Sequence, residues 1–202
     1  MFTQVIRAKA KDRAGLRKMW EKAEEELTPG AIGYLGVTGG IADDGTMIVV
    51  ARFDSEEAAR QNSTRREQDA WFREVLQYVE GQPTFKDCTD VELFGGGGSD
   101  DAGFVQIIQA RATDRDRLGQ INRDFDTEMR EQRPDLVGGL VAWHPDGTGW
   151  FTMVNYFTSE SEARTNEAKE LPPDVKAKFE EWMSLMEDVE YIDLHDPWMH
   201  SP

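Results

Sequence analysis

Two segments of this chain are nearly alike: FDSEEAARQNS at residues 53–63 and FTSESEARTNE at residues 157–167. Both place Phe, Ser, Glu, Ala, Arg and Asn in the same order. A second matching pair lies upstream, where FTQVIRAKAKDRAGL from residue 2 resembles FVQIIQARATDRDRL from residue 104. The chain is therefore a tandem duplication. The second copy is longer by two residues, which we assign to Gly149 and Trp150 after its tight turn.

The hydrophobic pattern changes period in the same order in both copies. Each copy opens with an alternating stretch typical of a strand, and helical spacing follows. The helical positions are Leu16, Met19, Trp20, Ala23 and Leu27 in the first copy and Leu118, Ile121, Phe125 and Met129 in the second. Two strands around an Asp-Gly turn come next, then a second helix capped by Ser55 or Ser159, and then a last strand. Only the first copy is expected to approach a capping box.

This order, βαββαβ, predicts an α+β fold of two ferredoxin-like repeats with antiparallel sheets. We place the first repeat at residues 1–95, a Gly-rich linker at 96–103, and the second repeat with a C-terminal tail at 104–202. Helices cover only one face of such a sheet, so the other face needs a partner. We expect the two sheets to pack as an intrachain dimeric α+β barrel, a pseudo-dimer within one chain. The alternative is two separate repeats that each dimerise with another chain, and further homo-oligomerisation stays open.

Composition restricts the partners of the protein. The net charge of −16 argues against nucleic acid and anionic membrane surfaces, because both attract clustered Lys and Arg. The single cysteine, Cys88, is expected to be a lone thiol in a strand, and the sequence shows no Cys and His spacing typical of a metal site. The first residues lack the apolar run of a signal peptide, and no apolar segment reaches membrane-spanning length. We therefore expect a cytoplasmic protein.

The segment FDSEEAARQNS, which follows the strand IVVARF, resembles the corresponding segment of the antibiotic biosynthesis monooxygenase-like group of dimeric α+β barrels. The resemblance covers both copies. It implies a superfamily that includes monooxygenases, haem-degrading enzymes and isomerases. Many members carry Ser-x-x-Ala-x-x-x-His here, and the histidine position falls on Asn62 and Asn166. The haem-degrading branch has an axial His further along, where this chain has Phe72 and Lys176, so we expect no haem and no other cofactor.

Asn62 and Asn166 are the first candidate ligand-binding residues. An amide donates and accepts hydrogen bonds but cannot act as a general base near neutral pH. Asn is also a poor residue inside a helix, so it needs a reason to be there. We expect Asn166 to orient a ligand and Asn62 to be chiefly structural. The alternative, that both amides tie the helix to a neighbouring strand, stays open.

Aromatic and polar side chains supply the remaining candidates. Trp143 and Trp150 crowd the hairpin of the second copy, which favours either a ligand cavity or ordinary core packing. Gln4 and Gln106 occupy matching places in the first strands and need partners or a ligand if they are buried. The three histidines, including His144 beside the hairpin turn, are expected to be exposed or capping. No catalytic constellation is evident in the sequence, and the catalytic residues stay unknown.

Two functions remain. The first is a small-molecule-binding barrel resembling cofactor-independent monooxygenases, which oxidises a small aromatic or polyketide-like compound in an apolar cavity. The electron-rich substrate would supply the reactivity with oxygen. The second is a non-catalytic or stress-associated barrel that sequesters a small hydrophobic molecule. The resemblance favours the first function, and the missing histidine favours the second.

Overall fold

The computed structural model describes the backbone of residues 1–202 and the side chains outside residues 125–130. Contacts divide the chain into two compact units. The first unit comprises Met1–Asp90 and Asp196–Pro202, and the second unit comprises Val91–His195. Both ends of the chain therefore belong to the first unit. Phe125 and Met129, expected at helical spacing, have side chains that lie outside the described residues.

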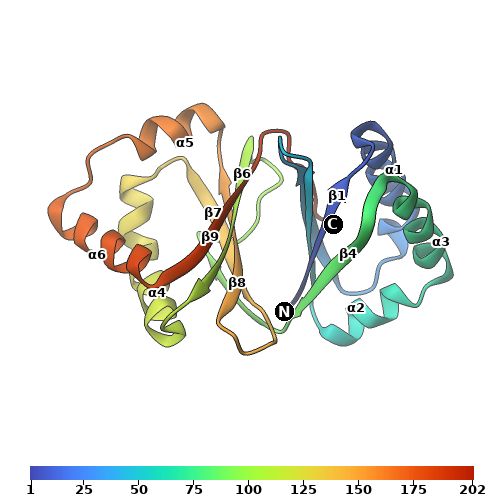
Figure 1. The fold of residues 1–202 in the computed structure, drawn as a ribbon, viewed down its shortest axis with the longest axis horizontal. Helices are drawn as coiled ribbons and strands as arrows, with labels where there is room; N and C mark the ends of the chain where they lie inside the picture. Colours follow the sequence, from blue (N-terminus) through green and yellow to red (C-terminus); the bar gives the residue numbers. More distant parts are fainter. The chain divides into compact units, whose positions relative to one another are not determined.

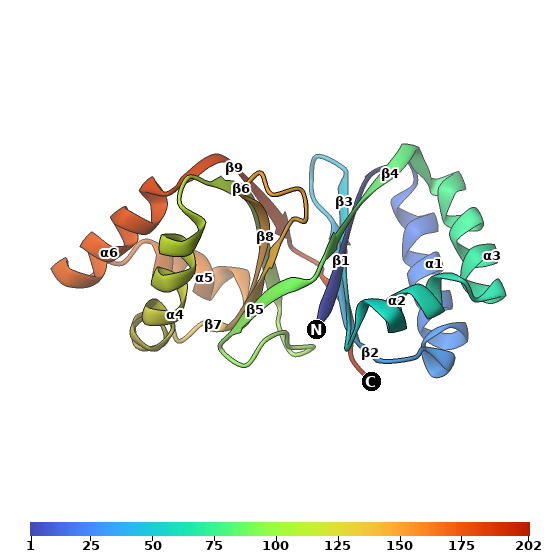
Figure 2. The same cartoon turned by 90° about the horizontal axis from the view of Figure 1, so that it is seen from below.

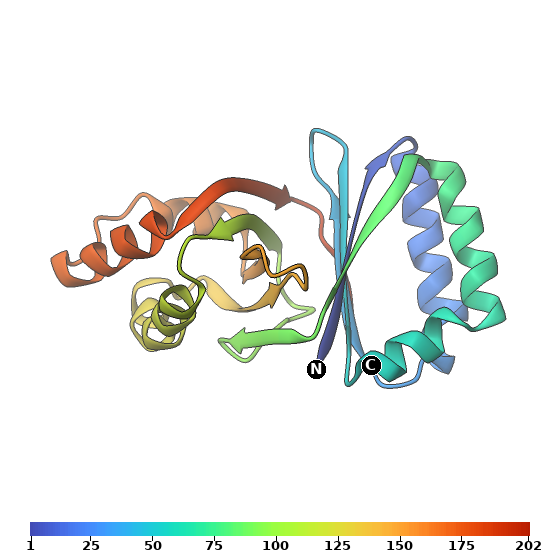
Figure 3. The ribbon, with the colours of Figure 1, turned by 60° about the horizontal axis from the view of Figure 1, so that its bottom comes forward.

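The first unit is an antiparallel sheet, in the order β10-β2-β3-β1-β4, with helices on one face (Figure 1). Figure 2 shows α1, α2 and α3 on that same face, and Figure 3 shows α1 and α3 side by side along the sheet. The elements are β1 (Phe2–Ala10), α1 (Arg13–Glu26), η1 (Thr28–Gly30), β2 (Tyr34–Ile41), β3 (Thr46–Phe53), α2 (Glu56–Ser63), α3 (Arg66–Val75), η2 (Leu76–Tyr78), β4 (Val79–Cys88) and the C-terminal β10 (Trp198–His200).

The second unit repeats this arrangement with the sheet order β5-β7-β8-β6-β9 and with α4, α5 and α6 on one face (Figure 2). The elements are β5 (Asp90–Phe94), β6 (Phe104–Ala112), α4 (Arg115–Gln132), β7 (Leu136–Trp143), β8 (Trp150–Phe157), α5 (Glu160–Glu167), α6 (Pro173–Ser184) and β9 (Met186–Leu194). The predicted α+β fold of two ferredoxin-like repeats is thus confirmed.

Two short strands exchange between the copies. β5 follows β4 directly in the sequence but belongs to the sheet of the second unit, where it lies beside β7. β10 comes from the end of the chain and pairs with β2 in the first unit, with Trp198 opposite Gly39. The sequence pattern instead predicted that the residues of β5 form the last strand of the first repeat and that those of β10 lie in a C-terminal tail. Each sheet is therefore completed by a strand from the other half of the sequence.

Capping side chains explain where the helices begin. Asp12 accepts a hydrogen bond from the Gly15 amide at 3.0 Å, and Ser55 accepts one from the Ala58 amide at 3.2 Å. Ser159 accepts one from the Glu162 amide at 3.2 Å, and its hydroxyl also donates to the Glu162 carboxylate at 3.2 Å. The arrangement closest to a capping box is thus in the second copy and not in the first, because Ala58 has no carboxylate to offer.

The second helical region of each copy is divided in two, whereas the sequence pattern had predicted one helix. α2 ends at Ser63 and α3 begins at Arg66. In the second copy Pro172 and Pro173 precede the body of α6, and proline has no backbone N–H to continue a helix from α5. The division matters for the site, because α6 can then pack at its own angle beside α4.

The two additional residues of the second copy lie in its hairpin loop. β2 ends at Ile41 and β3 begins at Thr46, whereas β7 ends at Trp143 and β8 begins at Trp150. Trp150 lies opposite Arg111 on the neighbouring strand, as Thr46 lies opposite Lys9. Trp150 is therefore a strand residue in the place of Thr46. Gly149 accepts a hydrogen bond from the Ala112 amide as Gly45 accepts one from the Ala10 amide, so the assignment of Gly149 and Trp150 to the insertion is wrong.

The core of each unit lies between its sheet and its helices. In the first unit the buried cluster is formed by Leu16, Met19, Met47, Val75, Val79 and Trp198. The cluster of the second unit includes Leu118, Ile121, Val141, Trp143, Phe151 and Trp182. Cys88 is a buried free thiol at the end of β4, as expected. Over the part of the chain that the structure describes, no helix is long and apolar enough to cross a membrane.

Candidate ligand-binding site

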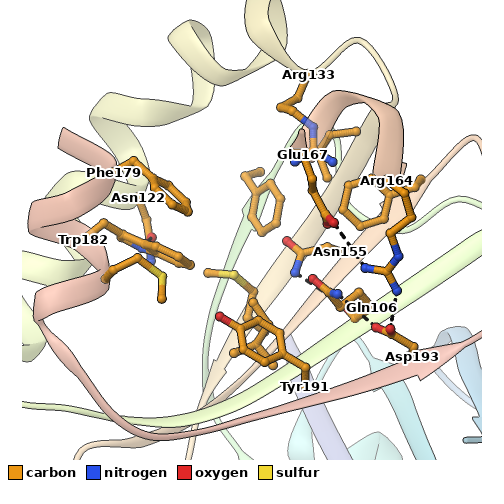
Figure 4. Close-up of a pocket in the computed structure, with 16 residues that line it drawn as sticks. Gln106, Asn122, Arg133, Asn155, Arg164, Glu167, Phe179, Trp182, Tyr191 and Asp193 are labelled. Atoms are coloured by element: carbon orange, nitrogen blue, oxygen red, sulfur yellow. Dashed lines mark hydrogen bonds and ion pairs between the residues drawn. The ribbon is translucent and has the colours of Figure 1, made fainter. Parts of the chain in front are cut away.

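A cavity of about 470 Å³ opens between the helices and the sheet of the second unit (Figure 4). Its walls come from β6, β8 and β9 on the sheet side and from α4, α5 and α6 on the helix side. This volume is in the range of small-molecule sites in proteins. The side chains that line it are not mixed evenly, because apolar rings and charged groups lie at different ends.

The apolar end is built by α6 and the strands below it. Phe179 and Trp182 stack with their ring centroids 5.7 Å apart, and Met153 and Ile108 line the sheet side. Figure 4 shows Phe179, Trp182 and Asn122 together at this end. The Trp182 indole N–H donates to Asn122 Oδ1 at 2.8 Å. Flat aromatic surfaces of this kind favour stacking with a planar ligand.

The polar end is organised around Arg164 of α5. Its guanidinium binds the Asp193 carboxylate of β9 and lies 3.2 Å from Glu167 Oε2 and 3.5 Å from Glu160 Oε1. Gln106 Nε2 donates to the other oxygen of Asp193 at 2.9 Å. Figure 4 shows the contacts of Asp193 with Arg164 and Gln106, and that of Arg164 with Glu167, on the side of the cavity opposite the Trp182 ring. Among the residues that line the cavity, Arg164 faces the two carboxylates of Glu167 and Asp193, and Arg133 is paired with Asp135, so this end has a net negative charge.

Two pKa shifts accompany this arrangement. Burial opposes the charge of Arg164, but the hydrogen bonds that its guanidinium donates to Asp193 and Glu167 prevail and raise its pKa. Burial, and then the nearby Glu167 charge, raise the pKa of the Tyr191 hydroxyl above its ordinary value of 10.0. Tyr191 therefore stays a neutral O–H group at physiological pH. It can donate to or accept from a bound molecule.

Arg133 and Asp135 hold the cavity wall beside Phe157. Arg133 donates to both oxygens of Asp135, at 3.1 Å and 2.7 Å, and its guanidinium lies 5.2 Å from the centre of the Phe157 ring. The side chains of the pair are only 12% and 1% exposed. Because Nε and Nη2 of Arg133 are engaged by the carboxylate in a bidentate pair, we assign Arg133 a structural role in positioning Phe157.

The two predicted glutamines occupy equivalent cavities. Gln106 lines the cavity of the second unit, and Gln4 lines a cavity of about 410 Å³ in the first unit. Gln4 Nε2 donates to Asp87 Oδ1 at 2.7 Å, which reproduces the bond between Gln106 and Asp193. The structure thus gives both amides the partners that the sequence analysis required for them.

Asn62 lines the first-unit cavity, but its amide is engaged by the backbone. Nδ2 donates to the carbonyls of Ile32 at 2.7 Å and Ala58 at 2.8 Å, and Oδ1 accepts from the Ile32 amide at 3.0 Å. Asn62 therefore fastens α2 to the segment before β2.

Asn166 is not among the residues that line the second-unit cavity. Its Nδ2 donates to the Glu162 carbonyl at 3.0 Å, and its Oδ1 accepts from Lys169 Nζ at 2.5 Å. Arg164 and Glu167, its neighbours on α5, line the cavity instead. The cavity-facing positions of α5 are therefore occupied by charged residues.

Trp143 and Trp150 line a different cavity of the second unit, of about 460 Å³, together with Arg111 and His144. Trp143 also belongs to the buried core, where its ring lies 5.2 Å from Phe151. His144 is buried, contrary to expectation, and its Nε2 is 2.9 Å from Thr152 Oγ1. The two tryptophans are therefore separated from the Arg164 cluster.

The sequence pattern did not indicate the following residues of the cavity between the helices and the sheet of the second unit: Asn122, Arg164, Glu167, Trp182 and Asp193. Charged residues on helices were interpreted as solvated faces, which is the usual case. A signal was nevertheless present, because Asp193 lies directly opposite Gln106 on the neighbouring strand, as Asp87 lies opposite Gln4. Recognising it requires the strand register, which the sequence does not provide.

No family model and no curated protein matches the chain. Solved structures share its fold along almost its full length. A candidate monooxygenase from Lactobacillus acidophilus NCFM has a TM-score of 0.76 at 12% identity, with 99% of this chain and 96% of that chain covered. A candidate monooxygenase from Fusobacterium nucleatum has a TM-score of 0.78 at 10% identity, with 99% and 94% covered.

An anthrone oxidase-like protein is similar as well, with a TM-score of 0.70 at 9% identity and with 99% and 92% of the two chains covered. The chain shares the α+β fold of these three proteins. Identities this low establish the fold alone, and chemistry has to be argued from the site. The expected resemblance to antibiotic biosynthesis monooxygenase-like proteins is confirmed at the level of this fold.

Proposed function

We propose that the second unit of this monooxygenase-like protein binds a small planar aromatic molecule bearing hydroxyl and carbonyl groups and oxidises it with molecular oxygen. The observation that carries the proposal is the division of the cavity into an aromatic end at Trp182 and a carboxylate end at Asp193. A ligand that satisfies both ends is apolar over most of its surface and polar at its edge.

The charge of the polar end selects the form of the ligand. Glu167 and Asp193 outnumber the Arg164 cation, and the charge of Arg133 is balanced by Asp135, so an anionic ligand would be repelled. A neutral hydroxyl, in contrast, donates its proton to a carboxylate oxygen. Phenols and hydroxylated tricyclic ketones meet this requirement. Transfer of the hydroxyl proton to Asp193 or Glu167 would leave an electron-rich ring that is reactive toward oxygen.

The overall reaction of such a substrate balances without an external reductant. In a hydroxylated anthrone, a ring CH₂ group reacts with O₂ to give a carbonyl group and one molecule of water. One oxygen atom enters the ring, the other leaves as water with the two hydrogens of the CH₂ group, and the substrate supplies the electrons. The similarity in fold to an anthrone oxidase-like protein supports this substrate class.

Oxygen uptake with 1,8-dihydroxyanthrone tests the proposal. The protein should increase consumption of oxygen and formation of the quinone above the uncatalysed rate. Asp193→Asn should reduce kcat by about 100-fold, the lower range for loss of a positioned proton acceptor. The matched control is Asp87→Asn, which alters the equivalent carboxylate of the first unit and should leave the rate unchanged.

Two results would contradict the proposal. Equal losses in Asp193→Asn and Asp87→Asn would show that the second-unit cavity has no special role. Quenching of tryptophan fluorescence by the anthrone with no oxygen uptake would show binding without catalysis, as expected for a sequestering protein.

A further inference from the structure

Asn122 holds an unused hydrogen-bond donor at the aromatic end of the cavity. Its Nδ2 atom is buried and has no hydrogen-bond partner among the residues that the structure describes. Asn122 lines the cavity together with Trp182 and Phe179. A buried amide donor usually finds a partner, and one that does not calls for an explanation.

The orientation of the Asn122 amide is fixed by its neighbour. The Trp182 indole nitrogen is a donor only, and it lies 2.8 Å from Asn122 Oδ1. Rotating the amide by half a turn would place its NH₂ group against the indole N–H, donor against donor. Oδ1 therefore faces Trp182, and Nδ2 is the atom left to meet a ligand.

The first unit lacks this amide donor because a tryptophan takes its place on the first helix. The repeat places Trp20 of α1 where the second unit has Asn122. The last helices are aligned by an equivalent backbone hydrogen bond: the Tyr78 carbonyl accepts from the residue after β1, and the Leu185 carbonyl accepts from the residue after β6. Three residues before these acceptors lie Val75 in the first unit and Trp182 in the second. At these two positions the first unit has an indole on its first helix, whereas the second unit has an amide there and an indole on its last helix.

We propose that Asn122 is a specificity-determining residue that donates a hydrogen bond from Nδ2 to a carbonyl oxygen of the ligand. This inference rests on the proposed function, because it assumes an aromatic ligand in the second-unit cavity. The carboxylate end accepts from hydroxyl groups, and the Asn122 end donates to an acceptor. The preferred ligand is therefore an aryl ketone or quinone oriented with its carbonyl group at α4.

A pair of compounds that differ in one carbonyl group tests the inference. 9-Fluorenone and fluorene have the same tricyclic skeleton, and neither is expected to turn over. Titration followed by tryptophan fluorescence and by calorimetry should show fluorenone binding about five- to tenfold more tightly, the effect of one hydrogen bond. Asn122→Leu should remove that preference, so that fluorenone and fluorene bind with equal affinity.

Asn122→Asp is the second variant, because it keeps an acceptor for Trp182 but replaces the donor with an acceptor. It should bind fluorenone more weakly than fluorene. The matched control is Gln120→Leu, which changes an exposed amide on the same helix outside the cavity and should keep the wild-type preference. Thermal unfolding of each variant establishes that it is folded.

The outcomes separate this inference from the proposed function. Wild-type protein that binds both compounds equally, or Asn122→Leu that weakens both equally, would overturn the role of Asn122 while it leaves aromatic binding intact. If neither compound binds, both proposals are contradicted. A preference for fluorenone that is lost in the Asn122 variants and kept in Gln120→Leu would establish the inference.

Discussion

Gln106 donates from Nε2 to Asp193 Oδ1 at 2.9 Å, and the equivalent residues of the first unit, Gln4 and Asp87, form the same bond at 2.7 Å. The second unit alone adds an arginine to this pair, because Arg164 binds Asp193 whereas its counterpart Arg60 binds Glu57 on its own helix. The duplicated sheets thus share a polar pair, and the helices of the second unit build a charged site upon it.

Asn62→Ala should destabilise the protein by about 1 to 3 kcal/mol, because it leaves the part-buried N–H and C=O of Ile32 and the buried Ala58 carbonyl without their shared side-chain partner. Chemical unfolding measures the loss. Asn166→Ala is the matched control and should cost less, because its partners are the Glu162 carbonyl of its own helix and an amine on a flexible side chain. Equal losses would contradict the difference in role, and a loss of fluorenone affinity in Asn166→Ala would return Asn166 to the site.

Cutting the chain between residues 98 and 99 should give two fragments that associate one to one. The first fragment carries β5, which belongs to the sheet of the second unit, and the second fragment carries β10, which belongs to the sheet of the first. Alone, the first fragment would leave the edge of β2 unpaired, and the second fragment would leave the edge of β7 unpaired. Light scattering of the mixed fragments measures the association.

Fragments 1–89 and 99–195 are the control, because they lack both exchanged strands. They should associate more weakly than the longer pair. Separate, stable monomers from the longer pair would show that strand exchange does not link the units, and would also argue against the intrachain barrel that the sequence predicts.

The repeat predicted the order of the elements because periodicity and turn chemistry are local properties of the sequence. Ser55 and Ser159 could be placed as caps for the same reason. The exchanged strands could not be predicted, because pairing of β10 with β2 depends on contacts between residues far apart in the chain.

The cavity was harder to predict than the fold. Whether a charged residue on α5 faces water or the sheet is decided by the angle of the helix, and a shift of two positions separates Asn166 from Arg164. Polar candidates on strands fared better: Gln4 and Gln106 both line cavities, because alternation along a strand fixes which face each side chain occupies.

The affinity for fluorenone should not change between pH 7 and pH 9 through ionisation of Tyr191. Burial and the Glu167 charge raise the pKa of the Tyr191 hydroxyl above 10.0, so the group keeps its proton throughout this range. The stability that the neutral hydroxyl contributes is present below pH 10 and is lost only as the pH rises through the raised pKa. A titration that loses affinity below pH 9 in wild-type protein but not in Tyr191→Phe would contradict this expectation.

Arg164→Met should destabilise the second unit at neutral pH, because it leaves Glu160, Glu167 and Asp193 facing one another without a cation. The expected cost is about 1 kcal/mol, since the Arg164 side chain is 40% exposed and solvent screens part of the interaction. The deficit should shrink at acid pH, where protonated carboxylates no longer repel one another.

Arg60→Met is the matched control for this change, because Arg60 occupies the same position in the first unit but pairs with the exposed Glu57 of its own helix. Its cost should be smaller and should depend less on pH. Urea unfolding of both variants at pH 7 and pH 4 supplies the comparison. A deficit in Arg164→Met that stays constant between the two pH values would show that Arg164 stabilises the unit by packing over Phe104, 5.1 Å away, and not by neutralising the carboxylates.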